Sequence, residues 1–158
     1  MANVIPFNGI LYNTEKIGSM ADVVAPPYDV ISPEEQQELY DRHENNIVRL
    51  ILGQKKPDDN ESDNPHTRAT NYFQKWNKEG IFTKDEKPCL YLEASEFKLG
   101  DTVLSRLGLI ARLKIEPFEK RVIMPHEKTF SKVKDERLGL VKSSQMNFSC
   151  IFGLYPDK

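Results

Sequence analysis

Residues 89–115 read CLYLEASEFKLGDTVLSRLGLIARLKI, two apolar-rich runs on either side of a glycine. The first run predicts a strand at Cys89–Phe97, and the second predicts a longer strand from Val103 to Ile115. The short turn at Leu99-Gly100-Asp101 places the two runs side by side, so we expect them to pair antiparallel as a hairpin. This hairpin favours a fold built on a largely antiparallel sheet.

Helix signals lie on the amino-terminal side of the hairpin. Ser32 as N-cap, Pro33 in the first helical position and Glu35 three residues after the cap form a capping box. They predict a helix that runs to about His43.

A second helix is predicted over His66–Glu79, where Gly80 is suited to end it. Four apolar residues recur there at the spacing of one helical face: Ala69, Tyr72, Phe73 and Trp76. Between the two helices, the acidic stretch Gln54–Pro65 predicts a mobile loop.

The remaining segments complete the prediction of the fold. Ser131 can cap a third helix to about Gln145, with Val133, Leu140 and Val141 on its buried face. Further strands are predicted at Val4–Phe7, Ile47–Leu52 and Phe148–Tyr155, with a polar turn at Asn13–Ser19. Together these elements predict the α+β class: a mixed, largely antiparallel sheet with about three flanking helices.

Composition limits the class of protein. Of the 158 residues, 39% are hydrophobic and 29% are charged, a mixture typical of globular chains. The length fits a single domain, 1–158. No basic leader precedes an apolar run, and no stretch reaches the roughly 20 apolar residues that cross a bilayer. We therefore expect a cytoplasmic protein without a membrane partner. Cys89 and Cys150 lack the spacing of metal ligands, so we expect two buried free thiols.

Charge is distributed unevenly along the chain. Residues 1–111 carry 12 basic and 18 acidic side chains, whereas residues 112–142 carry 9 basic and 5 acidic ones. The total is −2, so a general nucleic-acid binder is not expected and any recognition of an anion must be local.

The basic segment between residues 120 and 142 is the candidate site. Lys134 and Arg137 lie near the start of the predicted helix, where backbone N–H groups and cationic side chains together favour phosphate. Thr129 adds a hydroxyl, and His126 and Glu127 are candidate acid–base groups, Glu127 also a metal ligand. The alternative is an ordinary solvated face with chance ion pairs.

Three elements together resemble a known family. They are Val24-Ala25-Pro26-Pro27-Tyr28-Asp29-Val30-Ile31-Ser32, the helix end Trp76…Glu79-Gly80-Ile81, and His126-Glu127-Lys128-Thr129…Lys134…Arg137. In order and spacing they resemble the prokaryotic proteins grouped as domain of unknown function 1015 (DUF1015). The longer family members carry an Asp-Gly-His-His-Arg element further on. This sequence lacks it, so we expect residues 1–158 to be the amino-terminal portion of a longer family domain.

The resemblance implies a function. The family is similar in fold to the ParB and sulfiredoxin superfamily, which includes nucleotide-binding proteins and an ADP-dependent free serine kinase. That implies a nucleotide- or phosphate-binding domain of a kinase-like phosphotransferase, with ATP or ADP and magnesium as cofactors. Catalytic roles would fall to His126 and Glu127, and phosphate binding to Thr129, Lys134 and Arg137. Whether this chain acts alone stays open. The alternative is a non-catalytic binding or regulatory module that docks an acidic partner or a nucleic-acid backbone.

Overall fold

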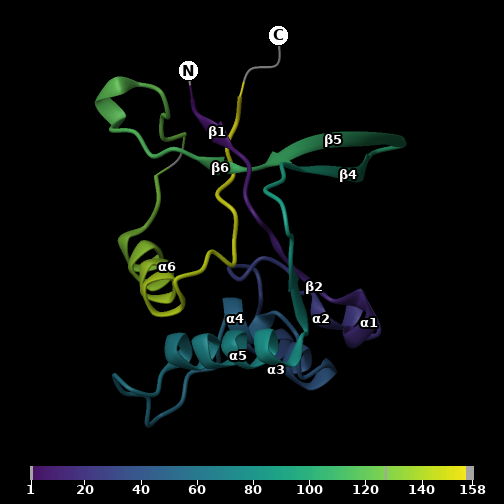
Figure 1. Cartoon of the computed structure of the whole chain (residues 1–158), viewed down its shortest axis with the longest axis vertical. Helices are drawn as coiled ribbons and strands as arrows, with labels where there is room; N and C mark the ends of the chain where they lie inside the picture. Colours follow the sequence, from purple (N-terminus) through teal and green to yellow (C-terminus); the bar gives the residue numbers. More distant parts are fainter. Residues whose placement is uncertain (1, 127, 156–158) are drawn as a thin grey trace. The chain divides into compact units, whose positions relative to one another are not determined.

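A computed structural model describes residues 2–126 and 128–155 of the chain (Figure 1). Helices and antiparallel strand pairs occur together, which confirms the predicted α+β class. The helices are α1 (Thr14–Ile17), α2 (Met20–Val23), α3 (Pro33–Arg42), α4 (Val48–Ile51), α5 (Pro65–Glu79) and α6 (Ser131–Ser144), with a 3₁₀ turn at Phe118–Lys120. The strands are β1 (Val4–Ile5), β2 (Ile10–Tyr12), β3 (Phe82–Lys84), β4 (Tyr91–Leu99), β5 (Thr102–Ile110) and β6 (Arg112–Leu113).

The predicted hairpin is confirmed by β4 and β5. Their antiparallel register runs from Tyr91 opposite Ile110 to Leu99 opposite Thr102. Gly100 has a φ of 60°, a backbone conformation that favours glycine in a two-residue turn. The second strand is shorter than predicted because it ends at Ile110, and the next two-residue strand, β6, pairs with β1 instead. The described strands thus form three two-stranded sheets: β1–β6, β2–β3 and β4–β5.

The chain divides into two compact units. Unit 1 lies within residues 1–11 and 84–128, and unit 2 within residues 12–83 and 129–158. Every buried hydrophobic residue that the structure describes belongs to unit 2: Ile17, Val23, Leu39, Val48, Leu50, Ile51, Ala69, Trp76, Ile81 and Leu140. Unit 2 therefore holds the hydrophobic core.

The two helices before the hairpin are confirmed, and their caps explain where they begin and end. The hydroxyl of Ser32 accepts a hydrogen bond from the Glu35 N–H at 3.1 Å, as an N-cap does. Asn64 caps α5 through a reciprocal pair of hydrogen bonds with Thr67. Gly80 ends α5 in the left-handed conformation, with a φ of 72°.

The predicted strand at Ile47–Leu52 is wrong, because this segment forms helix α4. Val48, Leu50 and Ile51 are all buried, and a short apolar run that is fully buried can be either strand or helix. The fully buried amide of Asn46 fixes the turn. Its nitrogen donates to two carbonyls before α3, and its oxygen accepts from the Val48 N–H at 3.0 Å. Similarly, part of the predicted turn at 13–19 is helix α1.

Several predictions for the carboxyl-terminal region are also wrong. Residues 148–155 contain no strand, and Ile151 is 98% exposed. Helix α6 is present, but its N-cap residue is Phe130 instead of Ser131. On its predicted buried face, Leu140 is buried whereas the two valines are exposed. Both predicted buried thiols, Cys89 and Cys150, are exposed.

Candidate functional site

A hollow of about 390 Å³ lies at the start of α3 in unit 2, and we call it the α3 pocket. It is lined by Ile31, Ser32, Pro33, Gln36, Leu52, Gly53 and Lys55. The volume falls within the range of sites that bind small molecules. A second hollow, of about 310 Å³ and similarly open, is lined by four exposed residues of the β4–β5 hairpin.

Two chain segments form the walls of the α3 pocket. One wall is the entry to α3 from Ile31 to Gln36, and the other is the segment Leu52–Lys55 after α4. The Gln36 amide crosses between them and donates to the Leu52 carbonyl at 2.7 Å. On the far side of the second wall, a β-carbon on Gly53 would lie 3.1–3.2 Å from Pro65, so the wall packs tightly against the start of α5.

The backbone around Lys55 is held on both sides. On one side, the Gln54 N–H donates to the Tyr40 hydroxyl at 3.1 Å, and the Gln54 carbonyl accepts from Arg68 at 2.7 Å. On the other side, the Lys56 N–H donates to Asp59 at 3.0 Å. Lys55 itself is exposed. Its backbone is therefore fixed, while its ammonium group is exposed and has no hydrogen bond or ion pair among the residues that the structure describes.

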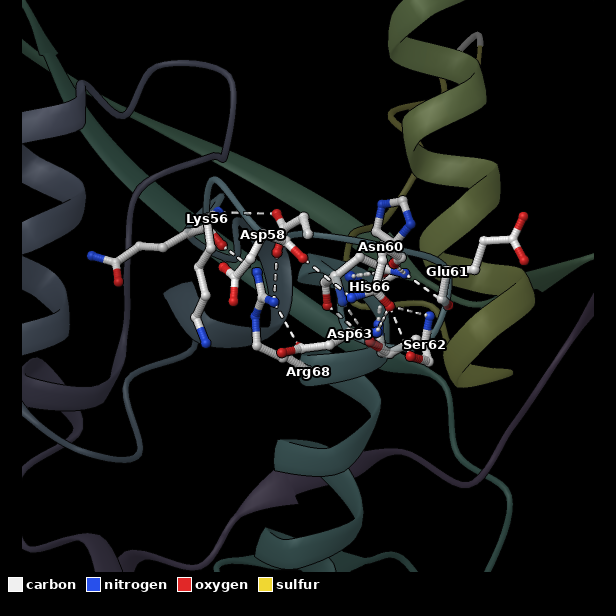
Figure 2. Close-up of polar contacts among 12 residues, drawn as sticks. Lys56, Asp58, Asn60, Glu61, Ser62, Asp63, His66 and Arg68 are labelled. Atoms are coloured by element: carbon white, nitrogen blue, oxygen red, sulfur yellow. Dashed lines mark hydrogen bonds and ion pairs between the residues drawn. The ribbon is translucent and has the colours of Figure 1, made fainter.

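Arg68 on α5 holds the acidic loop, residues 54–65, through ion pairs, as Figure 2 shows. Its Nη1 contacts Asp59 and Asp63, each at 2.7 Å. The hydrogen bond from Arg68 lowers the pKa of Asp59 below its usual value, and the same bond raises the pKa of Arg68. Asn60 adds a local turn by accepting from the Ser62 and Asp63 N–H groups. The loop was predicted to be mobile, yet polar contacts tie it to α5.

Charges of both signs lie around the α3 pocket. The start of α3 carries the positive end of the helix dipole, and Lys55 adds a full positive charge nearby. Glu34 and Glu35, in the first turn of α3, offset part of this potential. The two carboxylates outweigh the helix dipole and Lys55 in number of charges. Because Lys55 is the charged residue that lines the pocket, attraction of an anion depends on its ammonium group.

Arg137 contacts both segments that lead into this pocket. Its guanidinium lies 3.8 Å over the ring of Tyr28, its Nη2 donates to the Ile51 carbonyl at 2.8 Å, and its Nε contacts the carboxylate of Glu136. Nη1 is buried without an acceptor among the described residues. The other carboxylate oxygen of Glu136 lies 3.3 Å from His66 on α5.

The sequence model of a family described as "Protein of unknown function (DUF1015)" matches residues 4–158. The chain belongs to this family. No curated protein and no solved structure matches it. The DUF1015 match includes both units and the whole of the α3 pocket.

The predicted site residues of this DUF1015 chain that the structure describes belong to different units. Thr129, Lys134 and Arg137 belong to unit 2, the first two exposed and Arg137 half-buried. His126 is exposed in unit 1, and Glu127 lies outside the described residues. The α3 pocket and its lysine were missed by the sequence prediction. The Pro-Pro-Tyr-Asp-Val-Ile-Ser element could have indicated it, since its last two residues line the pocket.

Two further findings apply to the described part of the DUF1015 chain. No group of three or more His, Cys, Asp or Glu side chains there is arranged to bind a metal ion. None of the helices in that part has the length and apolar character needed to span a membrane.

Proposed function

We propose that this DUF1015 chain binds a phosphate-bearing small molecule, such as ADP or ATP, in the α3 pocket. The observation that supports this proposal most directly is the 390 Å³ hollow that combines a helix start, the Ser32 side chain and Lys55. Backbone N–H groups at a helix start and a lysine ammonium are two donors that phosphate sites commonly use. At α3, Pro33 has no N–H and the Glu35 N–H is bonded to the Ser32 hydroxyl, so the Glu34 N–H and the Lys55 ammonium are the donors proposed to meet phosphate. The polar tie between Gln36 and Leu52 keeps the two walls at a fixed spacing before a ligand arrives.

In the wider proposal the family is ParB/sulfiredoxin-like, and the phosphate belongs to a nucleotide used by a kinase-like phosphotransferase. Phosphoryl transfer depends mainly on positioning and charge neutralisation, and magnesium bound to the nucleotide phosphates would supply part of that neutralisation. His126 and Glu127 are the proposed acid–base groups. Thr129 and Lys134, both near the start of α6, are proposed to contact phosphate as well, with Arg137 treated separately below.

The test compares two neighbouring lysines. Isothermal titration of the chain with ADP, ATP plus magnesium, and inorganic phosphate would give dissociation constants for wild type, Lys55→Gln and Lys56→Gln. Both variants remove one exposed positive charge from the same loop, but only Lys55 lines the pocket. We expect Lys55→Gln to weaken binding about tenfold, the loss of roughly 1.4 kcal/mol, and Lys56→Gln to leave it nearly unchanged. Equal effects of the two variants, or no binding by wild type at millimolar nucleotide, would reject the proposal.

The second candidate function is a non-catalytic module that docks an acidic protein or a nucleic-acid backbone. It is favoured by the exposure of Lys134 and of Lys128, which leaves their charges available to a partner. Such binding falls steeply as salt rises, because phosphate contacts release counterions. Retention on heparin or DNA that disappears by moderate salt, together with indifference to ADP, would favour this function over the first.

A further inference from the structure

Arg137 contacts residues that lie next to both walls of the α3 pocket, and we call it the clamp residue. Its side chain is only 21% exposed, and two of its three nitrogens are already engaged by Ile51 and Glu136. The third nitrogen has no accessible surface and no acceptor among the described residues. A ligand in the pocket therefore has no free guanidinium edge to bind in this arrangement, and Arg137 does not line the pocket.

The partners of Arg137 lead directly into the two pocket walls. Tyr28, under the guanidinium, lies three residues before Ile31, the first residue of one wall. Ile51, whose carbonyl accepts from Nη2, lies one residue before Leu52, the first residue of the other. One side chain from α6 thus contacts the residues that precede both wall segments in the chain. All of these residues belong to unit 2.

Only an arginine can make this set of contacts. A planar guanidinium stacks on an aromatic face while its edge donates hydrogen bonds, whereas a lysine ammonium is a single point that does one or the other. The buried Nη1 without an acceptor among the described residues is a cost, which the stacking on Tyr28 and the hydrogen bond to Ile51 offset.

We propose that Arg137 is a positioning residue, which sets the spacing of the two walls of the α3 pocket through Tyr28 and Ile51 and thereby controls affinity for a phosphate-bearing ligand. The inference rests on the proposed function of the pocket. It changes the role of Arg137 from a direct phosphate ligand to a residue that acts through its neighbours. It also makes the pocket responsive to helix α6, because a displacement of α6 would remove the Arg137 contacts next to both walls and leave the Gln36–Leu52 hydrogen bond as the link between them.

The test uses Arg137→Lys, which keeps the charge and removes the planar fork. We expect the dissociation constant for ADP to rise about tenfold. At metal sites, removing a residue that orients a ligand typically weakens binding by about 10- to 100-fold, and the lower end of that range is expected here by analogy. In the unliganded variant, the backbone amide resonances of Gly53 and Lys55 should shift, because the wall has moved. A residue that contacted phosphate directly would leave those amides unshifted before ligand is added, and that result would overturn the inference.

A second pair of variants keeps the test decisive if Arg137→Lys fails to fold. Tyr28→Phe keeps the ring under the guanidinium and should bind ADP like wild type, whereas Tyr28→Leu removes the ring and should bind about tenfold more weakly. A merely structural role would lower the melting temperature of Tyr28→Leu and leave its dissociation constant unchanged. Affinity that is unaffected in Tyr28→Leu and Arg137→Lys, while Lys55→Gln still weakens binding, rejects the clamp and retains the proposed function. Failure of wild type to bind rejects both.

Discussion

Gly9 and Tyr91 lie so close together in unit 1 that a β-carbon on residue 9 would overlap the tyrosine hydroxyl. The same hydroxyl accepts from the Gly9 N–H at 2.7 Å and donates to the carboxylate of Asp85. The bond to Asp85 raises the pKa of Tyr91. One hydroxyl thus connects Gly9 with the segment Asp85–Tyr91, about 80 residues further along the chain, and this contact does not follow from the residue types alone.

Replacing Gly9 with alanine should destabilise the protein by about 1–3 kcal/mol, because the added methyl displaces the Tyr91 hydroxyl and overpacks the contact. Urea unfolding of wild type and variant measures the difference. Gly153→Ala is the control, since no atom of the described residues lies within 4 Å of its β-carbon position. Equal stability of Gly9→Ala and wild type would contradict the described contact.

Tyr12 gives a prediction for alkaline pH. Burial raises its pKa above the ordinary value near 10, and its hydroxyl donates to the Asn45 carbonyl at 2.7 Å. The folded state therefore holds this proton more tightly than the unfolded state does. The contribution of Tyr12 to stability should be constant below about pH 10 and be lost as pH rises further towards the raised pKa. Melting temperatures between pH 8 and 12 measure this, and Tyr12→Phe should show a shallower decline. An identical decline in both proteins would contradict the assignment.

Individual elements were predicted well where their signals are local. The caps at Ser32 and Gly80 and the turn at Gly100 each act within a few residues, so the sequence gives helix ends and the hairpin directly. Helix α4 was mistaken for a strand because its geometry depends on Asn46, whose bonds reach back more than 20 residues. The α3 pocket was missed for the same reason, since its walls come from two separate segments.

The acidic loop is tied to α5 by the side chain of Arg68, so substituting Arg68 tests how much these contacts stabilise the loop. Arg68→Lys removes the fork that contacts Asp59, Asp63 and the Gln54 carbonyl, so it should lower the unfolding free energy more than the loss of a single exposed ion pair does. Faster amide exchange over residues 54–63 should accompany the loss. Lys75→Gln breaks only the exposed pair with Glu79 at 3.8 Å and should cost less than about 0.5 kcal/mol. Similar costs for the two variants would show that the loop network contributes little.

The two units differ in what stabilises them: hydrophobic packing in unit 2 and backbone pairing in unit 1. Unit 2 contains the described core around Trp76, the single tryptophan. Unit 1 depends on backbone pairing, and both faces of its hairpin expose apolar residues: Leu92 at 83%, Leu107 at 73% and Leu99 at 68% are among them. A two-stranded hairpin without a covered face has little stability of its own in water. The α+β class was predictable from pattern, whereas this unequal distribution of the core was not.

We therefore expect amide exchange across β4 and β5 to be fast under conditions in which α5 stays protected. The double substitution Leu92→Thr and Leu107→Thr should reduce aggregation and binding of an apolar dye. It should leave the urea midpoint measured by Trp76 fluorescence unchanged, because the tryptophan reports on unit 2. A change of more than about 1 kcal/mol in the unfolding free energy of unit 2 would contradict the expectation that the hairpin does not stabilise unit 2.

Each unit carries one accessible thiol, Cys89 in unit 1 and Cys150 in unit 2. The sequence has no third cysteine, so spin labels or dye pairs attach at these two positions without any mutagenesis. Dipolar spectroscopy or single-molecule energy transfer between them would then follow how the separation of the units responds to ADP or inorganic phosphate. The two natural cysteines therefore allow the distance between the units to be measured in the unmodified sequence.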